Sequence, residues 1–290
     1  MAHTLPQVCL ASSANVGAGT LVTLAGSVVS SDRLDTGGRA PVDIAFDSLL
    51  VVTQLAVAAS SNWHPQHGLI LSASAVAAAE DYFRSILTLC VSVCSYCEDR
   101  VRPLETRMEH VFSGSVDGAV RGMLDLESLS SRDNVISWTK KVTGQDLSKS
   151  VSLDTTMREF ERACHIRHSA VHAGGYVSTR AASILGVAPG SWISFSSPTA
   201  IHEFVSVVAS TIRAYNQSLF SGLLGRWIDE SFLSGVWAED RVAFGSLWRA
   251  FRSEKDIESD RIAGGKVIRQ SAYNAYRAVR PLIVSRMASR

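Results

Sequence analysis

The chain has 290 residues, of which 46% are hydrophobic and 19% are charged, and its net charge is +1. This length suits one large domain or two small ones. The near-neutral charge excludes an overall attraction to nucleic acid or to membranes, so charge has to be read locally. Five cysteines, an odd number, do not fit a secreted disulfide framework. We therefore expect a cytoplasmic protein.

The first 40 residues are rich in Gly, Ser, Ala and Thr and predict an N-terminal extension of loops and short strands, with a strand or hairpin at Thr20–Val29. No basic residue precedes the first apolar ones, so we expect no secretory signal. The most apolar segment, Ile44–Ala59, is interrupted by Asp47 and Gln54 and is short for a membrane span. These features predict a soluble protein without a membrane anchor.

From Pro41 onward the spacing of apolar residues is helical. The predicted helices cover residues 42–60, 72–101, 116–128, 133–142, 154–173 and 199–220, and the tail from 223 to 287 is helical with breaks at Gly235 and Gly264–Gly265. Asp154 or Thr155 can cap the fifth helix, and Gly174 suits the left-handed position after its end. We predict an all-α fold with an N-terminal extension (1–40), a helical domain (41–220) and a basic helical C-terminal segment (221–290).

The predicted helix that ends before Gly174 carries the sequence CHIRHSAVHAGG at residues 164–175. On a helical wheel, Arg167 falls in the middle of an apolar stripe with Phe160, Cys164 and Val171. A polar stripe lies beside it and consists of Glu161, His165, His168 and His172. An arginine on a core-facing stripe is costly unless it reaches water or meets an anion, and its planar fork suits a carboxylate or a phosphate.

His172 lies in the last turn of this helix, where the negative end of the helix dipole favours the imidazolium. A histidine that titrates near neutral pH can both remove and deliver a proton. A phosphate-binding guanidinium beside such a group suits RNA cleavage, in which the 2′-hydroxyl attacks the phosphorus and the cation stabilises the developing charge.

The stretch from Arg167 to His172 resembles the R-x4-6-H motif of HEPN domains, and His168 stands where that family often has a polar residue after the arginine. Flanking segments resemble the RiboL-PSP type of the family: AAAEDYF at residues 77–83, ISW at 136–138, GQDL at 144–147 and GGYV at 174–177. The resemblance covers residues 42–220.

This resemblance implies a HEPN-like helical bundle and a metal-independent endoribonuclease that leaves a 2′,3′-cyclic phosphate and needs no cofactor. Family members usually act as homodimers whose motifs face each other, and many are toxins or antiviral effectors. Arg167 would bind the scissile phosphate, His172 would be the acid–base residue, and His168 would orient the site or contact RNA. Glu80 is a candidate partner for Arg167. A neutralising or activating protein partner stays open, as does an inactive module that only binds RNA or a partner.

Two metal-binding interpretations compete with this one. Cys90, Cys94 and Cys97 have the C-x3-C-x2-C spacing of radical SAM iron–sulfur motifs. The surrounding helical pattern instead predicts buried cysteines on one helix face. The three histidines of the polar stripe could hold a metal, but no supporting ligand pattern accompanies them, so we expect no metal site.

The tail from Arg241 to Arg290 has eleven basic and four acidic residues, a net charge of +7. One face of its last predicted helix carries Arg269, Tyr273, Arg277 and Arg280. Basic groups interleaved with aromatic rings can follow an RNA backbone and stack on bases. The competing interpretation is an ordinary solvated helix face.

Overall fold

The structure is a computed structural model that describes residues 38–105, 116–255, 261–263, 266–268 and 270–289. The chain divides after Gly38, and Arg39–Arg290 forms one compact unit. The helices are α2 (Pro41–Ala58), α3 (Pro65–Val93), α4 (Ser95–Val101), α6 (Val116–Asp125), α7 (Arg132–Thr143), α8 (Val151–Ala173), α9 (Thr179–Leu185), α10 (Pro198–Asp229), α11 (Trp237–Phe251) and α12 (Ala272–Ala288), with short 3-10 turns at Ser60–Asn62 and Leu147–Lys149. Strands β1 (Arg261–Ala263) and β2 (Lys266–Ile268) form a small antiparallel ribbon.

Helices dominate the described residues, which confirms the all-α prediction. The strand predicted at Thr20–Val29, with nearly all of the expected N-terminal extension, lies outside the described residues.

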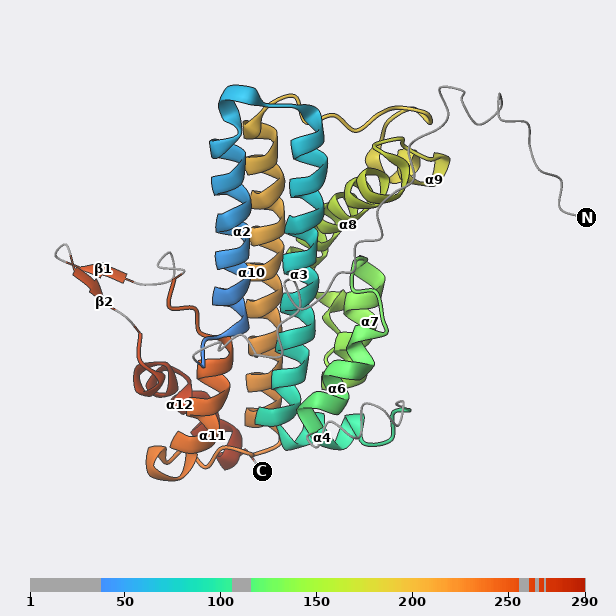
Figure 1. Cartoon of the computed structure of the whole chain (residues 1–290). Coiled ribbons are helices and arrows are strands. Elements are labelled where there is room, and N and C mark those ends of the chain that lie inside the picture. The colour runs from blue at the N-terminus through green and yellow to red at the C-terminus, as the bar shows by residue number, and fades with distance from the viewer. Residues whose placement is uncertain (1–37, 106–115, 256–260, 264–265, 269, 290) are drawn as a thin grey trace, which may run out of the picture. The chain divides into compact units, whose positions relative to one another are not determined.

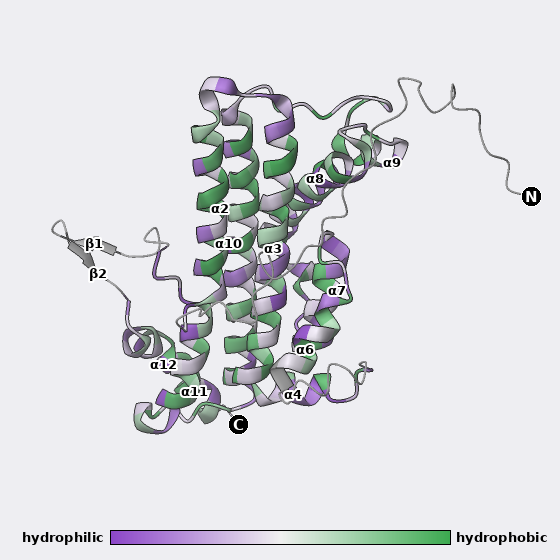
Figure 2. Ribbon diagram, in the orientation of Figure 1, coloured by the Kyte–Doolittle hydropathy of each residue, from purple (hydrophilic) through white to green (hydrophobic). Residues whose placement is uncertain are grey.

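Three helices, α2, α3 and α10, run alongside one another in Figure 1 and contact each other. Pro65 and Pro198 start α3 and α10 at the first helical position, where a missing backbone N–H costs nothing. Figure 2 shows hydrophobic residues along much of α2 and α10. Helix α8 packs against both α3 and α10, while α6 and α7 contact α3. The helix that carries the predicted motif is therefore anchored to the two longest helices.

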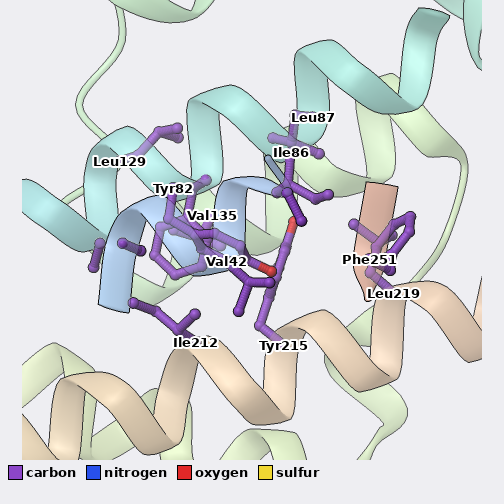
Figure 3. Close-up of a cluster of buried hydrophobic side chains, with 14 of the residues drawn as sticks. Val42, Tyr82, Ile86, Leu87, Leu129, Val135, Ile212, Tyr215, Leu219 and Phe251 are labelled. Carbon is purple, nitrogen blue, oxygen red and sulfur yellow. The ribbon is translucent and has the colours of Figure 1, made fainter. Parts of the chain in front are cut away.

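Aromatic rings form the core where α3, α8 and α10 meet. Phe83 packs edge-on against Phe160 and Tyr215, with ring centroids 5.5 and 4.9 Å apart. The Tyr215 hydroxyl lies 2.6 Å from the Thr139 hydroxyl, so this buried phenol is hydrogen-bonded. Figure 3 shows the surrounding side chains, among them Val42, Tyr82, Ile86, Ile212, Leu219 and Phe251.

One of the predicted helices is interrupted. The continuous helix expected over 72–101 is broken at Cys94, whose extended backbone (φ −136°, ψ 108°) separates α3 from α4. The helical pattern does not reveal the break, because Cys90 and Cys97 are buried on either side of it. The Cys94 sulfur accepts a hydrogen bond from the indole N–H of Trp227, a residue of α10.

The C-terminal residues extend the same compact unit. Helix α10 continues to Asp229, so the boundary expected after residue 220 falls inside a helix, and α11 contacts both α10 and α12. The buried Asp240 carboxylate accepts hydrogen bonds from the Gly235 backbone N–H (2.9 Å) and the Tyr276 hydroxyl (2.5 Å). The predicted break at Gly235 is confirmed (φ 79°), whereas Gly264–Gly265 lie outside the described residues.

Helix α2 is long and apolar enough to cross a membrane, the only such helix in the described part of the chain. Its inner side, with Leu49, Val52 and Ala56, is buried, and its outer side exposes Leu50, Val51, Leu55 and Val57. A core helix of a soluble protein meets the same criterion, so this finding carries no conclusion about a membrane.

Candidate functional site

The site is built on the C-terminal half of α8. The helix starts after Ser150, whose hydroxyl accepts a hydrogen bond from the Leu153 N–H, so the predicted cap at Asp154 or Thr155 is wrong. Asp154 lies in the first turn and instead binds the guanidinium of Arg158 at 2.9 Å.

The end of α8 follows the prediction. Gly174 has the left-handed backbone (φ 59°), and the Gly175 N–H donates to the Ser169 carbonyl at 2.8 Å, which closes the helix. The Ile193 N–H donates to the Gly175 carbonyl at 2.8 Å. The segment before α10 is thereby held against the end of the motif helix.

Arg167 lies on the packed side of α8. Phe160 and Cys164, on the same stripe, are buried, which confirms that the stripe faces the core up to this level. Val171, one turn beyond Arg167, is 50% exposed. Arg167 itself is partly buried, so it sits where α8 leaves the core.

The Arg167 guanidinium meets no hydrogen-bond acceptor within the described part of the chain. Its Nε atom is buried without a hydrogen-bond partner, a condition that only His202 Nε2 shares among the side-chain atoms of the described residues. Nearly all buried polar atoms in proteins are hydrogen-bonded, so an unpaired guanidinium nitrogen requires an explanation. An anionic ligand that binds at this guanidinium would supply one.

Glu80, the candidate partner of Arg167, pairs with another residue. Glu80 and Arg167 both act on the pKa of Cys164, which is raised chiefly by burial and further by Glu80, while Arg167 lowers it. The Glu80 carboxylate instead lies 3.6 Å from the Arg84 guanidinium. No ion pair joins Glu80 to Arg167 among the described residues, so the expected partnership is not formed in this structure.

His168 and His172 lie together on the exposed side of α8, with ring centroids 4.7 Å apart. His165 is partly buried, and burial lowers its pKa, an effect that Arg180 and His168 reinforce and Glu161 opposes. The described residues contain no group of three His, Cys, Asp or Glu side chains placed to hold a metal ion. Neither the histidine stripe nor the cysteine trio is therefore arranged as a three-ligand metal site here.

An exposed aromatic pair beside the motif was not predicted. Tyr176 follows the glycine exit of α8 and pairs through its backbone with Trp192. Their rings meet edge-on at 5.8 Å, and the two residues are 46% and 67% exposed. The short helix α9, between them in sequence, was also missed. Sixteen positions separate the two aromatics in the chain, so no local pattern links Trp192 to the motif.

The proposed basic face of the C-terminal helix is only partly free. Tyr273 is 47% exposed and carries the Arg277 guanidinium 5.9 Å from its ring centre. Arg280 donates from Nε to the Gly235 carbonyl at 2.9 Å, which gives it a structural role. Arg269 lies outside the described residues.

No protein-family model, curated protein or solved structure matches this chain. The indications of function therefore lie in the residues of this chain, above all in the stretch from Arg167 to His172.

Proposed function

We propose that this protein is a metal-independent endoribonuclease with a HEPN-like helical bundle. The observation that carries the proposal is the partly buried Arg167 guanidinium, which has a buried Nε and no acceptor among the described residues. A partly buried guanidinium without a carboxylate partner can bind a phosphate through two parallel N–H groups.

His172 is the proposed acid–base residue. It is exposed and ends the motif helix, so a substrate can reach its ring from solvent. In the proposed reaction, a neutral imidazole removes the proton of the RNA 2′-hydroxyl, and the resulting oxygen attacks the adjacent phosphorus. The 5′-oxygen of the next nucleotide then leaves with a proton delivered by an imidazolium. The products are a 2′,3′-cyclic phosphate and a 5′-hydroxyl, and no water is consumed.

His168 and Glu80 have supporting roles in this proposal. The His168 ring is close enough to His172 to limit its orientations. Glu80 is an anion already paired with Arg84, so it leaves the Arg167 guanidinium available to the phosphate.

The exposed pair of Tyr176 and Trp192 favours single-stranded RNA as the substrate. Exposed indole and phenol rings are platforms on which unpaired bases stack, whereas paired bases in a duplex present no free face. Tyr273 and Arg277 on α12 form a weaker candidate for a contact with the rest of the strand.

The active form is proposed to be a homodimer in the cytoplasm. His168, Val171 and His172 are exposed in the single chain, so two copies can bring their motif helices together. One histidine from each copy would then serve as base and acid. A toxin or antiviral effector, controlled by a neutralising or activating protein, is the biological role that fits such an activity.

The test is incubation of the pure protein with a single-stranded oligoribonucleotide in excess EDTA, followed by mass spectrometry of the products. We expect fragments that end in 2′,3′-cyclic phosphate, no cleavage of the oligodeoxyribonucleotide of the same sequence, and no cleavage by His172→Ala. His64→Ala, which removes another exposed histidine, should cleave like the wild type. RNA binding without cleavage would replace the proposal with a binding module, and equal cleavage by His172→Ala would refute the catalytic assignment.

A further inference from the structure

The break between α3 and α4 surrounds one sulfur atom with hydrogen-bond donors. The Trp227 indole N–H points at the Cys94 sulfur from 3.4 Å. Cys97, three positions later in the first turn of α4, is the second partner of this sulfur and donates to it through its thiol. These contacts lie at the break itself, where the Cys94 backbone is extended and not helical.

This set of donors suits a thiolate. A sulfur that accepts hydrogen bonds from an indole and a thiol is stabilised as the anion. The hydrogen bond from Cys97, supported by that from Trp227, lowers the pKa of Cys94 to about 6. The same bond to Cys94, together with burial, raises the pKa of Cys97, which therefore remains a thiol.

The two other described cysteines differ from this pair. Cys90 lies one turn earlier on α3, and burial raises its pKa. Cys164 on α8 is likewise a buried thiol with a raised pKa, and the charges that act on it are Glu80, Arg167 and Glu161. Among the described cysteines, Cys94 is therefore the candidate nucleophile and Cys97 is the thiol in contact with it. Cys90 and Cys164 remain protonated.

We propose that Cys94 and Cys97 form a peroxide-responsive redox couple. The Cys94 sulfur attacks one oxygen of hydrogen peroxide, the O–O bond breaks, and the released hydroxide takes a proton, which leaves a sulfenic acid on Cys94 and one water. The Cys97 sulfur then attacks the Cys94 sulfur, the S–O bond breaks, and the Cys97 proton leaves with the hydroxyl group as a second water. The net change joins two thiols in a disulfide and reduces the peroxide to two molecules of water.

Burial determines which oxidant can react. Cys94 and Cys97 are 2% and 0% exposed, so a bulky disulfide such as oxidised glutathione cannot reach them in the folded protein. Hydrogen peroxide is small and uncharged and can enter a packed interior. This property distinguishes the couple from an exposed thiol–disulfide exchange site.

Oxidation also changes the contacts of Trp227. The Cys94 sulfur accepts the indole hydrogen bond in the reduced state, and a disulfide sulfur is a much weaker acceptor. The Arg226 guanidinium, 4.1 Å from the centre of the Tyr96 ring, ties the segment between the two cysteines to α10. A disulfide across this segment should therefore change its contacts with Trp227 and Arg226 of α10.

The test uses the reduced full-length wild-type protein, treated with hydrogen peroxide and then blocked, digested and mapped by mass spectrometry. We expect a loss of two hydrogens on the peptide that contains Cys94 and Cys97, with Cys164 still reduced. We also expect no mixed disulfide with oxidised glutathione. Oxidation of Cys164 at the same rate as Cys94, or an unmodified Cys94, would overturn the proposal without any variant being needed.

Three variants identify the roles of the cysteines. Cys97→Ser should stop the reaction at a sulfenic acid on Cys94, which dimedone traps. Cys90→Ser and Cys164→Ser should still form the disulfide. A disulfide that disappears in Cys90→Ser and persists in Cys97→Ser would show that Cys94 is bonded to Cys90 and not to Cys97. That result would refute the proposed couple.

Discussion

The His168 ring lies 4.7 Å from the His172 ring, one turn earlier on the exposed side of α8. This contact restricts the His172 imidazole, because neighbouring side chains at i and i+4 meet on a helix surface. Replacing His168 with Ala should therefore lower kcat for RNA cleavage by about tenfold, whereas His172→Ala should lower it by roughly 10²–10⁴-fold. Single-turnover kinetics on one oligoribonucleotide measures both. Equal losses in the two variants would show that His168 is itself a catalytic group.

Replacing Arg167 should raise the stability of the protein and lower its activity. Arg167→Met replaces a guanidinium that has an unpaired buried nitrogen with an apolar side chain of similar length, so the free energy of unfolding should rise by about 1 kcal/mol. RNA cleavage should fall by about 10²-fold or more, because the phosphate contact is lost.

Urea unfolding and cleavage assays measure the two effects in the same preparations. The matched control is Arg162→Met on the same helix, where the exposed pair with Glu159 is worth less than about 1 kcal/mol and activity should be retained. A loss of stability in Arg167→Met would mean that the guanidinium has a structural partner in the protein.

Trp192 should contribute to substrate binding and not to the chemical step. Trp192→Ala removes a ring that is 67% exposed, so the fold should tolerate it. Loss of one stacked base costs about 1–3 kcal/mol, which raises KM for single-stranded RNA by roughly 5- to 160-fold at unchanged kcat. Trp192→Phe should recover most of the affinity. An unchanged KM in the alanine variant would remove the aromatic pair from the substrate site.

The bond from the Tyr276 hydroxyl to the Asp240 carboxylate should anchor α12. Tyr276→Phe deletes this bond between buried groups and should lower the free energy of unfolding by about 1.5–3 kcal/mol, because the acceptor is a carboxylate. Tyr273→Phe, an exposed neighbour on the same helix, should change stability by less than about 0.5 kcal/mol. Urea unfolding of both variants measures these changes in the free energy of unfolding. Equal changes in the two variants would show that the bond from Tyr276 to Asp240 does not anchor α12.

His165 should make the protein less stable in acid. Its pKa in the folded state is lowered, chiefly by burial, so below the ordinary pKa of 6.5 the unfolded chain binds a proton more readily than the folded one. This contribution to unfolding is absent well above that pKa and grows as pH falls through 6.5 towards the folded-state value. The charged and titratable groups that act on His165 are Glu161, Arg180 and His168.

Replacing His165 with Gln removes this titration. The stability of His165→Gln relative to the wild type should therefore rise when the pH is lowered from 7 to 5. The urea midpoints of both proteins at the two pH values measure their stabilities. If the difference between His165→Gln and the wild type is the same at pH 7 and pH 5, His165 does not destabilise the protein in acid.

The local features of the sequence determined most of the helices. The period of apolar residues located α2, α7 and α10, and glycine marked the end of α8 at Gly174 and the loop before α11 at Gly235. Both kinds of signal depend on near neighbours in the chain. The wheel also placed Arg167 on the packed stripe of α8 and His168 and His172 beside it, as found.

Only the tertiary structure decided which groups meet across the chain. The Cys94 sulfur and the Trp227 indole are 133 positions apart, and their hydrogen bond accompanies a helix break that the local pattern does not predict. The pairing of Tyr176 with Trp192, and the lack of an acceptor for Arg167 Nε among the residues that the structure describes, likewise follow from packing. Such contacts depend on how distant helices are brought together, and a periodic pattern carries no information about distance between separate segments.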